Sequence, residues 1–261
     1  MSKQKLEFCT TELDGRILTV TINRPEVMNS LHPAANLELE KVFNEFAGDP
    51  DQWIAILTGA GDRAFSAGND LKFQAGGGKR ERAETGFAGI TSRFDCNKPI
   101  IAAVNGVAMG GGFEIALACD LIIASDNAVF ALPEPRVGLA ALAGGLHRLP
   151  RQIGLKQAMG MILTGRRVSA AEGLQLGFVN EVVAQSELMA AARRWANMIL
   201  ECSPLSIRAS KAAVMSGLDE ADLQQAMNQK LDAVHTLFTS EDFIEGPKAF
   251  AEKRPPNWKG R

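Results

Sequence analysis

The sequence predicts an α/β fold, and three observations lead to that prediction. Apolar runs of strand length alternate with segments of helical pattern along much of the 261-residue chain. Glycine-rich turns stand where strands give way to helices, within 64–72 and within 99–119. Near residues 165–168 the pattern becomes mainly helical. We therefore expect an α/β core over 1–195 and a helical C-terminal segment over 196–261.

Composition limits the classes of protein that this chain can belong to. With 46% hydrophobic and 22% charged residues, it can bury a sizeable core. The formal net charge of −2 argues against nucleic-acid binding and against a polybasic membrane surface. The first residues lack the apolar core of a signal peptide, and the apolar runs are too short to span a bilayer. We expect a cytoplasmic protein with small-molecule or self-association partners, and with no nucleic-acid or membrane partner.

Cysteine and histidine usage argues against a metal site. The four cysteines are scattered and form no Cys-x-x-Cys pair, which is typical of buried free thiols in a reducing compartment. Only three histidines are present, without a His-Glu-x-x-His motif. We predict that the protein has no metal.

The N-terminal elements are predicted from turn and cap signals. Asp14-Gly15 separates the strands 6–13 and 17–23, and an Asp-Gly pair is among the strongest hairpin signals. Asn29-Ser30 offers an N-cap for a helix over 34–46. A strand over 53–57 follows.

The central part repeats the alternation of strand, turn and helix. Residues 64–72 indicate a short strand, a glycine turn and a polar helix start, and 99–104 indicate a buried strand. Three glycines, Gly110 to Gly112, then precede the helix-forming residues 113–119. The remaining predicted elements are strands at 121–124 and 128–131, a loop at 132–135, and helices at 188–202, 205–215 and 221–238. No period of 20–50 residues repeats.

Three familiar motifs are absent. The glycine cluster fails Gly-x-Gly-x-x-Gly, because Ile115 stands three residues after Gly112. Gly78-Lys79 is followed by Arg80 rather than Ser or Thr, which argues against a phosphate loop. Ser66 lies in Ala-Phe-Ser-Ala-Gly, which lacks the first glycine of a hydrolase nucleophile elbow.

The glycine junction has the chemistry of an oxyanion site. A helix N-terminus has unpaired N–H groups, and glycines let a ligand oxygen approach them. Glu114 follows at once, within a helix that carries no other charge, and Glu134 lies between two prolines. A single Glu is most often a solvated surface carboxylate. Burial disfavours its ionised form, however, and two such groups beside an oxyanion site suit proton transfer next to a carbonyl.

The same residues resemble a known family, the crotonase (enoyl-CoA hydratase/isomerase) superfamily. The segments that carry the resemblance are Phe65-Ser-Ala-Gly-Asn-Asp-Leu-Lys72, Asn105-Gly106 with Met109-Gly-Gly-Gly-Phe-Glu114, and Phe130-Ala-Leu-Pro-Glu134. The resemblance extends from Thr21 to Arg254. Within the superfamily, the chain looks most similar to carnitinyl-CoA dehydratases and short-chain enoyl-CoA hydratases. It implies a spiral of ββα units with a helical C-terminal segment that packs trimers, often paired as hexamers.

The resemblance also implies roles for individual residues. The backbone N–H groups of Asn69 and Gly111 correspond to the oxyanion hole. Glu114 corresponds to the base that activates water and Glu134 to the acid that protonates the substrate α-carbon. Residues implied to contact coenzyme A or substrate are Ala67, Gly68, Asp70, Leu71, Lys72, Gly110, Leu142, Phe250 and Lys253. Coenzyme A would be part of the substrate, so no separate cofactor is expected.

One segment departs from the family pattern. Relatives commonly show Gly-x-x-Pro-x-x-Gly-Gly after the second glutamate, whereas here Ala141 takes the Pro position and Leu142 follows it. A leucine where hydratases often have glycine would narrow the acyl pocket. Hydration of an enoyl-CoA thioester is the leading expectation. The alternatives are a carnitinyl-CoA-type dehydratase, an enoyl-CoA isomerase, and a non-catalytic subunit that binds CoA thioesters.

Overall fold

The computed structural model describes residues 6–77 and 81–261. It contains two compact units. The first takes in the chain up to Arg93 and then Ile100–Arg194, and the second takes in Phe94–Pro99 and Trp195–Arg261.

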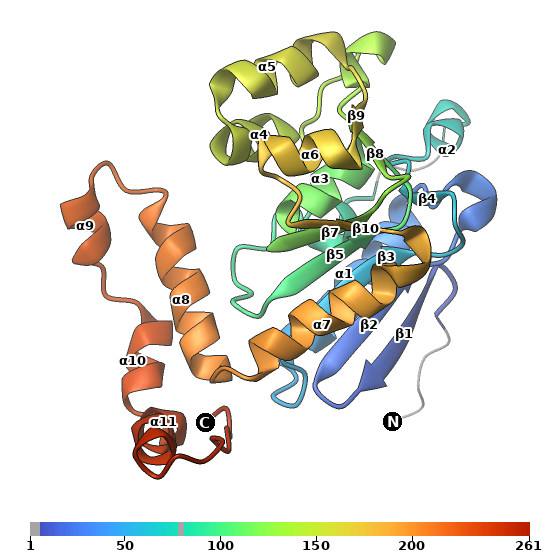
Figure 1. Ribbon diagram of the computed structural model, residues 1–261. Helices are drawn as coiled ribbons and strands as arrows, with labels where there is room; N and C mark the ends of the chain where they lie inside the picture. The colour runs from blue at the N-terminus through green and yellow to red at the C-terminus, as the bar shows by residue number, and fades with distance from the viewer. Residues whose placement is uncertain (1–5, 78–80) are drawn as a thin grey trace. The chain divides into compact units, whose positions relative to one another are not determined.

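Two sheets form the framework of the first unit (Figure 1). In the larger sheet β1 is antiparallel to β2 and the other neighbours are parallel. Its strands, in spatial order, are β1 (Cys9–Asp14), β2 (Ile17–Ile22), β3 (Ile54–Gly59), β5 (Ile100–Val104), β7 (Leu121–Ser125) and β10 (Glu181–Val183). The smaller sheet has the order β4 (Ala64–Ser66), β6 (Val107–Met109), β8 (Val129–Ala131) and β9 (Val168–Ser169).

Consecutive strands are divided between the two sheets in a repeating way. In each of the pairs β3–β4, β5–β6 and β7–β8, the first strand joins the larger sheet and the second joins the smaller one. A helical segment follows each pair, namely α2 (Leu71–Ala75), α3 (Gly111–Ala118) and the 3₁₀ helix Glu134–Val137. The predicted α/β class built from ββα units is therefore confirmed. Because β4, β6 and β8 are neighbours, their three C-terminal ends come together at one edge of the smaller sheet.

Helix α1 (Pro33–Gly48) contributes a large part of the core of the first unit. Its inward residues include Leu39, Phe43 and Phe46, which are fully buried. The predicted cap at Asn29-Ser30 is wrong, because the ring Nδ1 of His32 accepts the Ala35 N–H (3.1 Å) at this helix start.

Helix α3 lies between strands of the smaller sheet and other helices of the first unit, and it is buried over most of its length. The rings of Phe113, Phe130 and Phe178 pack together with centroids 5.1–5.2 Å apart, which ties α3 to β8. The sequence analysis missed the strand β6 between the predicted buried strand and the glycines. α4 (Gly145–Ile153), α5 (Leu155–Thr164) and α6 (Ala170–Leu176) gather beside the smaller sheet (Figure 1).

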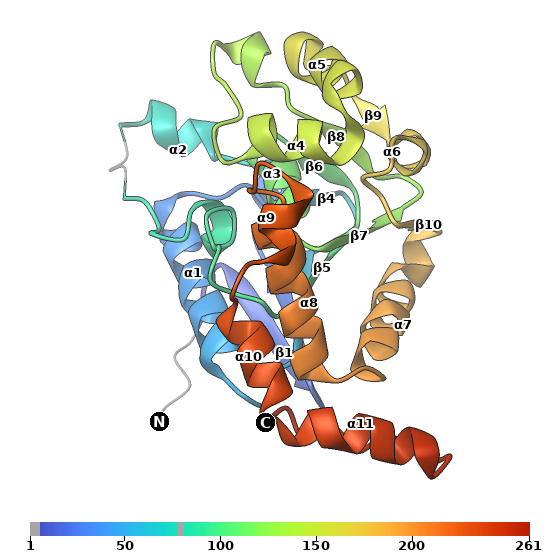
Figure 2. The same cartoon turned by 90° about the vertical axis from the view of Figure 1, so that its left-hand side faces the viewer.

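The regular elements of the second unit are helices. α7 (Leu188–Leu200) leads into it, and α8 (Pro204–Gly217), α9 (Leu223–Met227), α10 (Asp232–Phe238) and α11 (Glu241–Ala251) follow (Figure 2). The single helix predicted over 221–238 is wrong, because the chain leaves the helix after Met227 and passes through an extended Leu231. Within the parts of the chain that the structure describes, no helix has the length and apolarity needed to cross a membrane.

Candidate active site

The first feature of the site is the turn that follows β4. Gly68 has φ +85°, a conformation that favours glycine. A Cβ placed there would stand 2.7 Å from the Gly111 nitrogen and 2.7 Å from the Met109 oxygen. The backbone of this turn therefore lies directly against the backbone of the β6–α3 turn. Ala67 and Gly68 are thereby placed beside the start of α3.

The second feature is the glycine turn between β6 and α3. Gly110 combines φ +55° with ψ −124°, which a residue with a side chain rarely adopts. Gly112 packs so closely on β4 that an added Cβ would lie 1.9 Å from the Ser66 oxygen. Two of the three glycines are therefore required by conformation or by close packing. Together they bring the N-terminus of α3 against the end of β4.

The two predicted oxyanion donors, Asn69 and Gly111, belong to these two adjoining turns. Among residues 6–77 and 81–261, no acceptor is found for the N–H of Asn69 or of Gly111. The flanking amides are bonded: Asp70 N–H donates to the Leu31 oxygen (3.1 Å) and Gly110 N–H donates to the Ala131 oxygen (2.9 Å). Each donor is thus an unpaired N–H beside a bonded one, which is the state that a carbonyl oxygen of a substrate needs.

Glu114 lies in the first turn of α3 with a side chain that is almost fully enclosed. Its residue is 4% exposed, and its Oε1 accepts the Gly145 N–H (2.8 Å) at the first residue of α4. Burial raises the pKa of Glu114 to about 7, with the Gly145 N–H opposing the shift and the neighbouring Glu134 adding to it. Near neutral pH this carboxyl group can therefore both accept and release a proton.

Glu134 follows β8 and begins the 3₁₀ helix Glu134–Val137 where a loop was predicted. A Cβ on Gly110 would stand 2.7 Å from Glu134 Oε1, so the carboxyl group lies beside the glycine turn. Its Oε2 is buried, and no hydrogen-bond partner for it exists among the described residues. Burial raises the pKa of Glu134. Two enclosed carboxyl groups therefore meet next to two unpaired N–H donors.

Comparison with known proteins identifies the family. The family model described as Enoyl-CoA hydratase/isomerase matches residues 12–261. The chain belongs to the enoyl-CoA hydratase/isomerase family. It is 44% identical over 253 residues to a carnitinyl-CoA dehydratase of Proteus mirabilis (strain HI4320), covering 95% of this chain and 96% of that protein. The same identity extends over 254 residues to a carnitinyl-CoA dehydratase of Escherichia coli (strain K12), with 95% and 97% covered.

Solved structures agree with this assignment. The fold superposes with a TM-score of 0.91 on an enoyl-CoA hydratase from Mycobacterium tuberculosis H37Rv, at 37% identity and covering 97% of this chain and 99% of that one. A carnitinyl-CoA hydratase from Mycobacterium avium gives a TM-score of 0.78 at 39% identity, covering 98% and 100%. The predicted family and its crotonase fold are therefore confirmed.

Other residues that the family resemblance pointed to take varied positions. Lys72 and Leu71 are exposed at the start of α2, close in sequence to the Asn69 donor. Asp70 has both carboxylate oxygens engaged, one with the Phe73 N–H and one with Arg24. Leu142 is 80% exposed in the segment that leads to α4. Phe250 and Lys253 belong to the second unit, and both are exposed there.

Sequence reasoning missed one side chain beside Glu114. Arg148 is partly buried, donates to the Thr91 oxygen (2.9 Å), and interacts electrostatically with Glu114. Nothing in the sequence of its own helix indicates this position. Phe87, which the sequence offers as a candidate for the apolar wall of the acyl pocket, has its ring against the start of α3, since a Cβ on Gly111 would stand 2.6 Å from it. The flanking Gly86 and Gly89 both have positive φ in the tight turn around this ring.

Proposed function

We propose that this chain catalyses reversible addition of water across the 2,3 double bond of an enoyl-CoA thioester. The observation that carries the proposal is the meeting of the buried Glu114 and the half-buried Glu134, whose Oε2 is enclosed, with the unpaired N–H groups of Asn69 and Gly111. Membership of the enoyl-CoA hydratase/isomerase family and the names of the relatives support a hydro-lyase that acts on a CoA thioester.

In this proposal the thioester oxygen binds between the Asn69 and Gly111 N–H groups. Glu114 removes a proton from a water molecule as the water oxygen bonds to the β-carbon, and the electron pair of the double bond moves toward the thioester oxygen. The enolate charge is stabilised by the two donors, which are fixed in the backbone before reaction. Glu134 then gives its proton to the α-carbon. Dehydration runs through the same steps in reverse, with the roles of the two groups exchanged.

The second candidate is dehydration of a carnitinyl-CoA-type hydroxyacyl thioester. It is favoured by the 44% identity to carnitinyl-CoA dehydratases, above the 37% identity to the tuberculosis hydratase. An isomerase needs one carboxyl group to move a proton between carbons, so the presence of Glu134 beside Glu114 favours hydration or dehydration over isomerisation. We further propose a homo-oligomer, a trimer or a pair of trimers, in keeping with the family.

Contacts with the coenzyme A portion are part of the same proposal. The backbone near Ala67 would face the adenine, and Lys72 would lie near the phosphates. Phe250 and Lys253 are proposed to reach the ligand from the C-terminal helical segment. No separate cofactor is required, because the thioester supplies the electron sink.

A direct assay separates these proposals. Purified protein mixed with crotonyl-CoA should remove the absorbance of the conjugated thioester as water adds. Parallel assays with a carnitinyl-CoA-type thioester and with a 3-enoyl-CoA identify the dehydratase and the isomerase. Tight binding of CoA thioesters without change in any of them would instead indicate a non-catalytic binding subunit.

The pH dependence of hydration should be bell-shaped. Glu114 must be ionised to accept a proton from water and Glu134 must be protonated to act as the acid, so only the form that combines these two states is active. Burial raises the pKa of both groups, that of Glu114 to about 7, and the two neighbouring carboxyl groups titrate as a pair. The value of kcat/KM should therefore fall on both the acidic and the alkaline side of an optimum, and initial rates between about pH 5 and 9 measure both limbs. A profile that lacks either limb would contradict the mechanism with two carboxyl groups.

Leu142→Ala is expected to change which acyl groups are accepted while the fold stays intact. The side chain is 80% exposed, so its truncation removes little core packing. If Leu142 borders the acyl chain, the ratio of kcat/KM between a longer and a shorter enoyl-CoA should rise roughly tenfold or more, since one methylene of pocket space changes selectivity by about 1–3 kcal/mol. Leu13→Ala, at an exposed leucine of β1, is the control. Equal ratios in both variants would place Leu142 outside the acyl pocket.

A further inference from the structure

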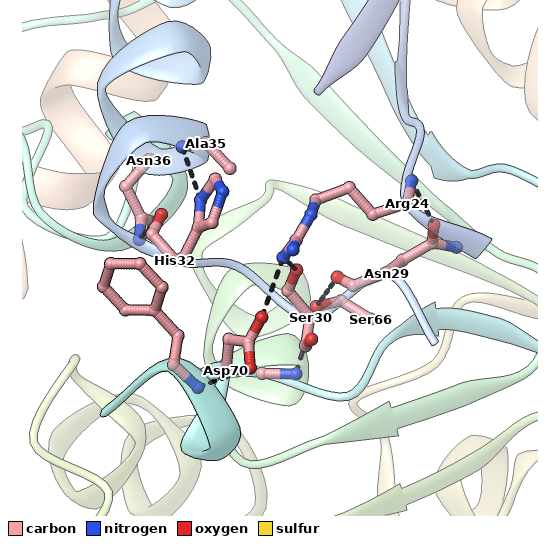
Figure 3. A network of polar contacts seen from close by, with 10 residues as sticks. Arg24, Asn29, Ser30, His32, Ala35, Asn36, Ser66 and Asp70 are labelled. Atoms are coloured by element: carbon pink, nitrogen blue, oxygen red, sulfur yellow. Dashed lines mark hydrogen bonds and ion pairs between the residues drawn. The ribbon is translucent and has the colours of Figure 1, made fainter. Parts of the chain in front are cut away.

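The turn that carries the Asn69 donor is built against a second stretch of the chain, residues 24–31 (Figure 3). The Leu31 N–H donates to the Gly68 oxygen (2.8 Å), and the Leu31 oxygen accepts the Asp70 N–H (3.1 Å). Leu31 therefore pairs across Asn69 and binds the residues on both sides of it. The Asn69 N–H takes no part in this pairing.

Arg24 binds the same turn through Asp70, the residue that follows Asn69. Its Nη1 donates to Asp70 Oδ2 (3.2 Å) and also to the Ser30 oxygen. The side chains of Arg24 and Asp70 are 13% and 11% exposed, so their ion pair is largely protected from water and salt. Asp70 Oδ1 accepts the Phe73 N–H (3.1 Å) and caps α2. Burial alone would raise the pKa of Asp70, but the Phe73 N–H and Arg24 lower it overall.

Asn29 and Ser66 bind the turn through Gly68, the residue that precedes Asn69. Asn29 is fully buried with φ +54°, its Oδ1 accepts the Arg24 N–H (3.0 Å), and its Nδ2 donates to the Ala64 oxygen (2.7 Å). The Ser66 hydroxyl donates to the Asn29 oxygen (2.8 Å) and accepts the Gly68 N–H (3.1 Å). Figure 3 shows these groups converging on one short length of backbone. Ser66 thus links the Gly68 N–H of the turn to the backbone of Asn29, and the side chain of Asn29 is in turn bonded to Arg24 and to the start of β4.

From this arrangement we infer that Arg24 and Asp70 are positioning residues, which hold the Asn69 N–H at the place where the thioester oxygen gains charge. The inference rests on the proposed function, because it concerns the same oxyanion site. A preorganised donor stabilises the enolate only if its position is fixed, and a displacement of about 1 Å can cost roughly 10²-fold in rate. Loosening the turn should therefore lower kcat far more than it alters KM.

The test compares Arg24→Gln, Arg24→Lys and Asp70→Asn with the unaltered chain. Arg24→Gln removes the charge, and we expect kcat for crotonyl-CoA to fall roughly ten- to hundredfold with KM little changed. Arg24→Lys retains a cation that can reach the same oxygens, so it should recover much of the loss. Arg166→Gln is the control. It removes the ion pair between Arg166 and Glu172, and the side chains of both residues are 37% exposed. That control should keep its full activity.

A spectroscopic measurement separates positioning from a general loss of stability. Acetoacetyl-CoA loses its C2 proton to a base, and the resulting enolate absorbs ultraviolet light when its charge is stabilised on the oxygen. The unaltered chain should show this enolate signal on binding. Arg24→Gln should bind with a weaker signal per bound molecule when the measurement is made well below the melting temperature of the variant. If Arg24→Gln does not fold, Asp70→Asn supplies the same comparison, because its amide oxygen can still accept the Phe73 N–H while its NH₂ group replaces the oxygen that accepts from Arg24.

Different outcomes bear on the inference and on the proposed function. An unaltered chain that forms the enolate but does not hydrate crotonyl-CoA overturns the hydratase proposal, while a weaker enolate signal in Arg24→Gln still supports positioning. Full kcat and full enolate signal in both Arg24→Gln and Asp70→Asn overturn positioning and leave the hydratase proposal standing. An unaltered chain that shows neither turnover nor enolate overturns both.

Discussion

Replacing Glu114 by Gln is expected to lower the turnover of crotonyl-CoA by roughly 10²–10⁴-fold, the range associated with loss of a positioned acid or base. The amide keeps an oxygen that can accept the Gly145 N–H, so the start of α4 should remain in place. What the variant loses is the ability to take a proton from water. Glu134→Gln should produce a loss of similar size, because its amide cannot give a proton to the α-carbon. Steady-state rates with crotonyl-CoA measure both.

The stability of Glu114→Gln provides a control with a definite sign. The pKa of Glu114 is raised on folding, from a model-compound value of 4.5 to about 7. Its stabilising contribution is therefore complete below the unfolded pKa and is lost as the pH rises through the folded pKa. The variant should gain melting temperature relative to the unaltered chain as the pH increases from about 5 to 8. Near-full activity in either glutamine variant would disprove the mechanism with two carboxyl groups.

Gly112→Ala is expected to abolish activity by displacing the start of α3. An added Cβ would stand 1.9 Å from the Ser66 oxygen, and a backbone atom cannot swing away as a flexible side chain can. The helix must shift or the protein must accept strain, with a cost of about 1–3 kcal/mol or more in unfolding free energy. The shift moves the Gly111 donor and Glu114 together. Both the unfolding free energy and kcat should fall.

Gly160→Ala is the matched control for this substitution. Gly160 lies within α5, and a Cβ there meets nothing within 4 Å. Alanine in an open helix position favours the helix by roughly 0.5–1 kcal/mol over glycine. The same chemical change should therefore stabilise one helix and disrupt the other. Chemical denaturation of both variants tests this contrast, and similar stability in the two would refute the packing argument at Gly112.

The sequence predicted the larger features because each of them has a strong local signal. Asp14-Gly15 lies at the turn between β1 and β2, and the buried run before Asn105 forms β5. The glycines Gly110 to Gly112 lie between a strand and a helix, as their spacing predicts, although the strand is β6. Glu114 was identified by its apolar neighbours, and its helix is indeed buried.

The features that sequence reasoning missed depend on contacts between distant residues. The strand β6 is only three residues long and is stabilised by pairing with β4 and β8, so it has little local pattern. The ββα repeat was expected only from the family resemblance, because its helical parts range from the four residues of the 3₁₀ helix Glu134–Val137 to the eight of α3, which leaves no fixed period in the sequence. The bonds of Arg24 to Asp70 join positions 46 residues apart. Nothing near either residue indicates that partner.

The predicted helix cap at Asn29-Ser30 failed for an instructive reason. Asn29 has the composition of a cap, but its side chain bonds to the Ala64 oxygen and to the Arg24 N–H instead. An Asn side chain can hydrogen-bond either to the first N–H groups of a helix or to backbone groups elsewhere in the chain. The neighbouring sequence does not distinguish these two uses. The helix instead begins at Pro33, with His32 as its cap.

Both proposed oxyanion donors are backbone N–H groups, and this decides which positions near the site can change. The side chain of Asn69 takes no part in that role, because its Nδ2 donates to Gln74 Oε1 (2.6 Å). Another residue could therefore stand at position 69 without removing the backbone donor. At Gly68 a Cβ would meet the Gly111 nitrogen at 2.7 Å, so almost any replacement would disturb the site. Substitutions are therefore more restricted at position 68 than at position 69. A comparison of relatives that considered position 69 alone would misjudge which of them retain the backbone donor.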